Sequence, residues 1–319
     1  MAPRRPDGAG ARGAAADARR PTAVGERLAA GDYVIAVEMD PPKGFSAAKM
    51  LAGAQTLAEA GADVIDVADS PMARMRMSPW AACRIIQEAG IETILHFPTR
   101  GRNLLRLQGD LLAVHALGIR NVFVCMGDPV TIGDYPGATD NVDVVPTALM
   151  RTITASFNEG SDRSGASIGE PTSFVVGCAV SPNAGDLEKE VQLLHKKIEA
   201  GCSFGLSQPM FTPEPLERLR DAYRERYEED LMLPILAGVL PLVSSRHAEF
   251  LHNEVPGIVI PDDVRDRMGK AGDDGEAEGL ALARDLVAQL RERAAGVYLM
   301  PPFERIDLAA EVVEAARTP

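Results

Sequence analysis

The chain of 319 residues contains no apolar run long enough, at about 20 residues, to cross a lipid bilayer. Its first segment, MAPRRPDGAGARGAAADARRPTAVGER, also has no apolar block of the kind that signal peptides carry. Because this segment is rich in Ala, Gly, Arg and Pro, we predict a disordered tail over residues 1–25 and one domain over residues 26–319. An organelle transit peptide, which is Arg-rich and poor in acids, is the alternative reading of the tail.

Cysteine is scarce, and basic residues are outnumbered by acidic ones. The four cysteines are far apart, with no CxxC and no Cys/His pair at metal-binding spacing, so the sequence predicts no structural zinc site. Free thiols fit a reducing cytoplasm, which is the expected location. The formal net charge of −13 argues against a nucleic-acid-binding surface. It leaves small anionic ligands open, because a local cationic site can lie inside an acidic protein.

What the sequence does contain is a regular alternation of apolar runs and helical patterns. Short continuous apolar runs are typical of strands that are covered on both faces. They occupy residues 33–38, 63–68, 92–97, 121–126, 173–180, 203–208, 233–240 and 296–300. The helical patterns between them lie at residues 46–60, 79–89, 102–118, 143–158, 185–200, 213–228, 244–254 with 276–294, and 303–316.

Eight such strand–helix units predict an α/β protein with a single-domain (β/α)8 TIM barrel. A doubly wound sheet is the alternative, and we disfavour it because no GxGxxG follows the first strand. Two segments, residues 158–173 and the acidic, Gly-rich KAGDDGEAEG at 270–279, are predicted to be surface insertions. The second of them would lie within the seventh connection.

Polar side chains stand at the C-terminal ends of six predicted strands, several of them close to a proline. Proline ends a strand and stiffens the loop that follows. In a TIM barrel these strand ends carry the active site, so we expect the polar side chains to gather at its mouth. They are Glu38, Asp40, Asp66, Asp69, His96, Asp128, Asn183 and Gln208.

Together these motifs resemble the methylenetetrahydrofolate reductase family. The resemblance rests on VEMDPPKG, VADSPMARMRMSPW, RGRNLLRLQGDLL, GIRNVFVCMGDP, KKIEAGCSFGLSQPMF, GVLPLVSSRHAEFLHNEVPGI and GVYLMPPFERIDLAAE. It is closest to the reductase half of bifunctional bacterial proteins that join a homocysteine methyltransferase to it. The resemblance implies a TIM barrel enzyme of one-carbon metabolism. Such an enzyme reduces 5,10-methylenetetrahydrofolate to 5-methyltetrahydrofolate, with NADH or NADPH as electron donor and bound FAD as relay.

The resemblance also implies roles for single residues. Glu38 would be the general acid that helps to open the five-membered ring of the folate. Asp128 would be a second catalytic group, lying near the flavin and the pterin. Gln208 would hydrogen-bond the pterin, and Leu251 would stand where some members place an aromatic side chain that covers the substrate. For each residue a purely structural role is the alternative, such as a solvated strand-end acid or a loop cap.

His96 and Lys197 would contact the flavin, Lys197 at the diphosphate, where a cation suits an anion. A lysine near a helix C-terminus is favourable in any case, so Lys197 has a structural alternative. Arg100 and Arg102 are further candidates for a phosphate or for the glutamate tail of the folate. Five positions depart from the family pattern around the cofactor, namely Pro98, Gly101, Met126, Gly177 and Ser181.

Two further hypotheses stay open, the first because of these departures and the second because the resembling proteins are fused to a methyltransferase. In the first, the same reaction proceeds without FAD, and hydride passes directly from NAD(P)H to the folate. In the second, the protein binds folate without catalysis and partners a separate methyltransferase. A homo-oligomer is in keeping with the family, although the sequence shows no interface signature.

Overall fold

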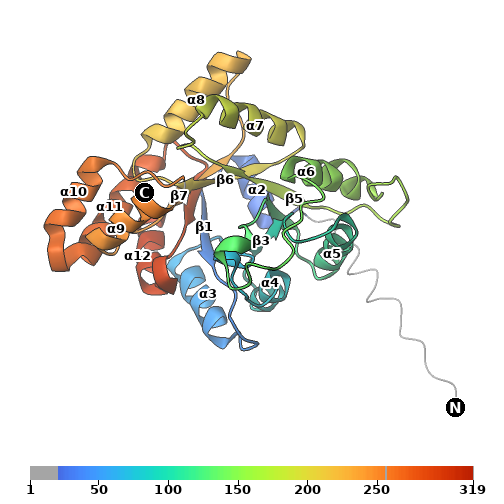
Figure 1. Cartoon of the computed structure of the whole chain (residues 1–319), viewed down its shortest axis with the longest axis horizontal. Coiled ribbons are helices and arrows are strands. Elements are labelled where there is room, and N and C mark those ends of the chain that lie inside the picture. Colours follow the sequence, from blue (N-terminus) through green and yellow to red (C-terminus); the bar gives the residue numbers. More distant parts are fainter. Residues whose placement is uncertain (1–20, 256, 319) are drawn as a thin grey trace.

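Eight apolar runs pair as parallel strands around one closed barrel in the computed structural model, which describes residues 21–255 and 257–318 (Figure 1). Strands adjacent in sequence are adjacent in the barrel, and the last strand pairs with the first. This arrangement confirms the predicted (β/α)8 TIM barrel. The strands are β1 (Val34–Met39), β2 (Val64–Val67), β3 (Thr93–Pro98), β4 (Asn121–Cys125), β5 (Val175–Val180), β6 (Phe204–Pro209), β7 (Ile235–Val239) and β8 (Gly296–Leu299).

Helices surround the strands and connect them (Figure 1). Their apolar sides pack on the outer face of the barrel, as fully buried Leu57 and Leu107 illustrate. None of the described helices is both long and apolar enough to cross a membrane. The connecting helices are α3 (Ala48–Ala60), α4 (Pro79–Glu88), α5 (Leu104–Ala116), α6 (Pro146–Ala155), α7 (Leu187–Glu199), α8 (Glu214–Tyr227), α9 (Ser245–Glu254), α10 (Asp262–Ala271) and α11 (Gly275–Leu290), and α12 (Ile306–Arg317) follows β8.

A helix before β1 packs against the barrel core. Most of the predicted tail, residues 1–20, lies outside the described residues. Ala23–Ala30 form helix α2, whose start is capped by the Thr22 hydroxyl accepting from the Gly25 N–H at 3.0 Å. Val24 and Leu28 of this helix are buried in the same apolar cluster as Val34 of β1. Helix α2 therefore begins inside the segment predicted as tail, because an Ala- and Arg-rich composition also suits a short helix.

The acidic stretch at residues 270–279 is largely exposed and lies within the seventh connection, as predicted, and it is helical. It ends α10, makes one turn at Gly272–Asp274 and begins α11. A Cβ atom at Gly279 would lie 1.8 Å from the carbonyl oxygen of Leu242. Glycine is needed there because the helix approaches the chain that leaves β7, and not because the segment is a loop.

The other predicted insertion, residues 158–173, is a compact loop. The Asp162 carboxylate accepts hydrogen bonds from the backbone N–H groups of Ser164 and Ala166, at 2.8 and 2.9 Å. Ser161 and Ser167 form an isolated antiparallel bridge. The loop thus satisfies many of its polar groups internally.

Candidate functional site

The C-terminal ends of the strands enclose a cavity of about 430 Å³. Six residues were given catalytic or binding roles by the resemblance, and four of them line this cavity. Each of the four comes from a different strand or strand end, so these four gather at the mouth. They are Glu38, His96, Asp128 and Gln208. Tyr298 of β8 and Asp69 after β2 also line the cavity.

Glu38 lies near the end of β1 and is largely enclosed, with 25 % of its side chain exposed. The Tyr298 hydroxyl donates a short hydrogen bond to its Oε2 atom. Burial raises the pKa of Glu38 to about 7, against the opposing effect of His96 and with the help of nearby carboxylates. A carboxyl group with this pKa can hold a proton near neutral pH and give it to a ligand.

His96 of β3 lies between two carboxylates. Its Nε2 atom is 3.0 Å from Oδ1 of Asp66 on β2 and 4.0 Å from Oε2 of Glu38. Burial alone would lower the pKa of His96, but the charge of Asp66 and then that of Glu38 outweigh it and raise the pKa to about 9. The imidazole therefore carries a positive charge at neutral pH. The sequence placed Asp66 at a strand end but did not pair it with His96.

Asp128 lines the cavity and also holds the loop between β2 and α4. Its Oδ2 atom accepts a hydrogen bond from the Met72 N–H at 2.7 Å. Ser70, Met72 and Ala73 in this loop have positive φ angles of 49°, 56° and 52°. Left-handed backbone is unfavourable for residues other than glycine, so the bond from Asp128 helps to keep a strained loop in place.

Gln208 reaches the cavity because β6 is irregular at this point. The register with β7 shifts between Leu206 and Pro209. Ser207 stabilises the irregularity: its hydroxyl accepts from the Gly238 N–H at 2.8 Å and donates to the Gln208 carbonyl at 2.9 Å. The Gln208 side chain is exposed at the cavity, where its amide can both donate and accept.

A second cavity of about 420 Å³ lies on the other side of Glu38. Its charged groups are paired: Arg76 lies 3.1 Å from Asp40 and 3.6 Å from Glu304, and Lys49 lies 2.9 Å from Glu304. Its apolar wall comes from Met39, Pro42, Met50, Met72, Pro301, Phe303 and Ile306. Glu38 is the residue common to the linings of the two cavities.

Lys197 and Leu251 line neither cavity. The buried Lys197 donates from Nζ to the Ala179 carbonyl at 2.6 Å and lies 3.7 Å from Glu190. It therefore stabilises the packing of α7 on β5. Leu251 is buried in a separate apolar cluster with Leu242, Ile258 and Met268.

The residues near the mouth do not fit the diphosphate of FAD as the resemblance implied. Lys197 is committed to Ala179 and Glu190. Among the described contacts, Arg100 pairs with Asp140 at 2.9 Å and Arg102 with Asp69 at 2.5 Å. All three cations that the sequence offered for a phosphate thus have partners within the protein.

One departure from the family pattern, Gly177, is explained by packing, and Gly127 in the turn after β4 is fixed in a similar way. A Cβ atom at Gly177 would lie 2.4 Å from the ring of Phe204, which occupies the core at this level. A Cβ atom at Gly127 would lie 2.8 Å from the Cβ of Pro98, so Pro98 packs directly on the turn after β4. Both glycines are therefore required by their neighbours in this chain.

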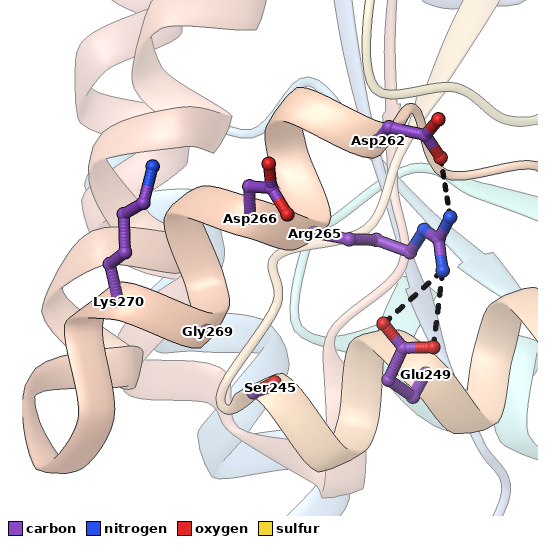
Figure 2. Close-up of a pocket in the computed structure, with 7 residues that line it drawn as sticks. All are labelled: Ser245, Glu249, Asp262, Arg265, Asp266, Gly269 and Lys270. Carbon is purple, nitrogen blue, oxygen red and sulfur yellow. Dashed lines mark hydrogen bonds and ion pairs between the residues drawn. The ribbon is translucent and has the colours of Figure 1, made fainter.

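A third hollow, of about 630 Å³, lies between α9 and α10 (Figure 2). Figure 2 shows Arg265 bridging Glu249 and Asp262, and its Nη1 atom is 3.2 Å from Oε2 of Glu249. The hollow contains none of the predicted site residues. Its one arginine is paired with two carboxylates, and none of the strand ends contributes to it, so we assign the site to the barrel mouth although this hollow is larger.

Comparison with known proteins found relatives of low sequence identity. A probable methylenetetrahydrofolate reductase (NADPH) of Caenorhabditis elegans is 23 % identical over 189 residues, which cover 57 % of this chain and 26 % of the worm protein. The match thus spans only about a quarter of the relative's length.

Solved structures share the fold at low sequence identity. A protein of Clostridium thermocellum, described as binding two copies of 5-methyl-5,6,7,8-tetrahydrofolic acid, has a TM-score of 0.58 and 13 % identity, over 91 % of this chain and 97 % of that one. Tryptophan synthase of M. tuberculosis has a TM-score of 0.51 and 14 % identity, over 95 % and 100 %. The family model for methylenetetrahydrofolate reductase matches residues 23–315. The chain therefore belongs to the methylenetetrahydrofolate reductase family.

Proposed function

We propose that this protein reduces 5,10-methylenetetrahydrofolate to 5-methyltetrahydrofolate, with NADH or NADPH as electron donor. The observation that carries the proposal is Glu38, an enclosed carboxyl group whose pKa is raised to about 7 at the barrel mouth. Opening the five-membered ring of this substrate requires a proton on N10. An acid that is still protonated near neutral pH is suited to supply it.

The two cavities on either side of Glu38 match the two halves of a folate. In our proposal the pterin lies in the first cavity, where the Gln208 amide can hydrogen-bond it. The p-aminobenzoyl ring lies in the second cavity, against Met72 and Phe303. N10 connects the two halves of the substrate, so it would lie beside Glu38.

The chemistry then follows in two steps. Glu38 gives its proton to N10 while the bond between N10 and the bridging carbon breaks, which leaves an iminium cation at N5. Hydride from the reduced nicotinamide adds to the bridging carbon, so the nicotinamide is oxidised and the carbon becomes the methyl group. The negative charges of Asp69 and Asp128 at the cavity would stabilise the cation. Glu38 regains its proton from solvent.

FAD is the relay that the resemblance implies, and it would accept hydride from NAD(P)H and pass it to the folate. Lys197, which the resemblance placed at its diphosphate, has Ala179 and Glu190 as partners. That pairing favours the second candidate, direct hydride transfer. An absorbance spectrum of the purified protein before and after addition of excess FAD separates the two. Flavin bands that persist through desalting support the relay, whereas a spectrum without them supports direct transfer.

Replacement of Glu38 by Gln tests the acid itself. Glu38→Gln keeps the shape of the side chain but has no proton to give. We expect kcat for folate reduction to fall by about 10²- to 10⁴-fold, the usual contribution of a general acid. Binding of NAD(P)H should survive, as should its oxidation by an artificial acceptor if the protein holds flavin. Glu88→Gln, at an exposed ion pair, is the control. Loss of both activities together would make Glu38 structural.

A folate-binding protein without catalysis is the remaining candidate. The description of the Clostridium thermocellum protein motivates it. Calorimetric binding of 5-methyltetrahydrofolate, with no turnover from either nicotinamide donor, would support it over the reductase. We also propose that the protein is cytoplasmic, forms a homo-oligomer and works with a partner methyltransferase. Size-exclusion chromatography with light scattering tests the oligomer.

A further inference from the structure

Asp66 is the most enclosed acid at the barrel mouth. It is fully buried on β2, and neither of its carboxylate oxygens has a hydrogen-bond partner among the described residues. A buried carboxylate is unfavourable unless a charge of opposite sign lies beside it. Within the described part of the chain, Asp66 makes one ion pair, and its partner is His96.

His96 places this charge next to the proton donor. Its Nε2 atom lies 3.0 Å from Asp66 and 4.0 Å from Glu38, so one nitrogen faces both acids. Phe123 covers the imidazole, with the ring centres 4.7 Å apart. The side chain is only 13 % exposed, which limits the access of water to its charge. Three neighbouring strands thus bring these side chains together: β1 contributes Glu38, β2 contributes Asp66 and β3 contributes His96.

We propose that Asp66 and His96 are positioning residues for the reaction: Asp66 keeps His96 as an imidazolium, and the imidazolium limits how tightly Glu38 holds its proton. This inference rests on the proposed function of Glu38 as proton donor. It gives His96 a task that requires no flavin. A general acid is most effective when its pKa lies near the working pH, so an acid that holds its proton too tightly is a poor donor.

The other groups that face Glu38 explain why a cation is needed. Asp66, Asp40 and Asp128 all raise the pKa of Glu38, and burial raises it further. Arg76 pairs with Asp40. The Tyr298 hydroxyl donates a hydrogen bond to Glu38 but carries no charge. His96 is the cation that acts directly on Glu38, and its effect on the pKa is larger than that of any single nearby acid.

The first test is the pH dependence of kcat for the variants His96→Asn and Asp66→Asn. A general acid must be protonated, so activity falls as the pH rises through the pKa of Glu38. Loss of the imidazolium in His96→Asn should move this fall upward by about 1 to 3 pH units, the effect of an opposite charge at this range. Asp66→Asn removes both the support for the imidazolium and one acid beside Glu38, so its upward shift should be smaller. The double variant should resemble Asp66→Asn.

The second test does not depend on catalysis. The chain has five histidines, and 15N-labelled imidazole signals can follow each of them through a pH titration. One signal should remain that of an imidazolium until about pH 9, disappear in His96→Asn and titrate at lower pH in Asp66→Asn. His115→Asn is the matched control, because His115 is a half-buried histidine on α5 that contacts Ser173 away from the mouth.

The outcomes separate this inference from the proposed function. A charged histidine that depends on Asp66, with the expected shifts of the pH profile, supports both. The same histidine in a protein without turnover would confirm the pair and reject the reductase. If His96 titrates below neutral pH, or if its titration is the same in Asp66→Asn, the inference is wrong. Unchanged pH profiles in folded variants, checked by circular dichroism, would also overturn it.

Discussion

At the scale of single residues, Glu38 owes its chemistry to partners that come from other strands. The strand-end acid was predicted from the sequence, because a carboxyl group between a buried run and two prolines is unusual. Tyr298 was not, since it lies 260 residues away and the register of β1 and β8 brings it close. The pair of Asp66 and His96 escaped prediction for the same reason: contact between strands is decided by register.

The Tyr298 hydroxyl should favour the ionised form of Glu38, since it donates a hydrogen bond to the carboxylate. Tyr298→Phe removes this bond with little change of shape. We expect the alkaline fall of kcat to move upward by up to about 1 pH unit. The control is Tyr33→Phe, because the buried Tyr33 hydroxyl has no hydrogen-bond partner in the described structure. If both variants keep the wild-type pH profile, Tyr298 does not influence the proton donor.

Lys197 and Leu251 show the limit of transferring residues by resemblance. Both occupy the expected positions in the sequence, yet Lys197 reaches a backbone carbonyl and Leu251 fills an apolar cluster. A motif fixes the place of a residue along the chain. The direction of its side chain depends on the packing of α7 and α9, which the motif does not contain.

At the scale of elements, the strands and connecting helices were predictable because their patterns are local. Continuous apolar runs predicted β1 to β8, and Gly after a helix marked several helix ends, as at Gly61, which has φ +112°. The predictions departed from the structure at α2, which begins inside the predicted tail, and at α10, which the predicted helices did not include. At α2 an Ala- and Arg-rich composition suggested a tail, and only packing against the barrel core accounts for the helix.

Gly177 offers a test of how tightly β5 and β6 pack. Gly177→Ala would place a methyl group 2.4 Å from the Phe204 ring, and a fully buried ring has little room to move. We expect the free energy of unfolding to fall by about 1 to 3 kcal/mol, the usual cost of overpacking. Urea denaturation measures the change.

Gly185→Ala is the matched control, since a Cβ atom there meets nothing within 4 Å. It should leave the urea midpoint nearly unchanged. Equal stability of Gly177→Ala and wild type would show that the Phe204 ring can shift, and Gly177 would then need another explanation.

At the scale of the whole molecule, the mouth should make stability depend on pH. The folded state raises the pKa of Glu38 from 4.5 to about 7, so it binds this proton more tightly than the unfolded chain does. Stability therefore falls as the pH rises from 4.5 to 7. The pKa of His96 is raised from 6.5 to about 9, so its contribution is fully present below pH 6.5 and is lost as the pH rises through 9.

Glu38→Gln should remove the first of these two losses. Between pH 4.5 and pH 7, we expect the free energy of unfolding of the variant to rise by about 1 to 3 kcal/mol relative to that of wild type. This range allows for the part of Glu38 that water reaches. Urea unfolding at closely spaced pH values measures the difference. Glu88→Gln at the exposed pair with Arg84 should run parallel to wild type. If the difference in free energy of unfolding between Glu38→Gln and wild type is the same at every pH, Glu38 has the same pKa in the folded and unfolded states.

The closure of the barrel also restricts how this protein can associate. Each of the eight described strands is hydrogen-bonded to a neighbour on both sides. A closed ring presents no edge strand to which another chain could add by backbone pairing. Within the part of the chain that the structure describes, the surfaces left for a second copy or another protein are therefore those of the outer helices and the loops. Substitutions on those surfaces should therefore alter association of the native fold. Association should not change the hydrogen bonds between the strands.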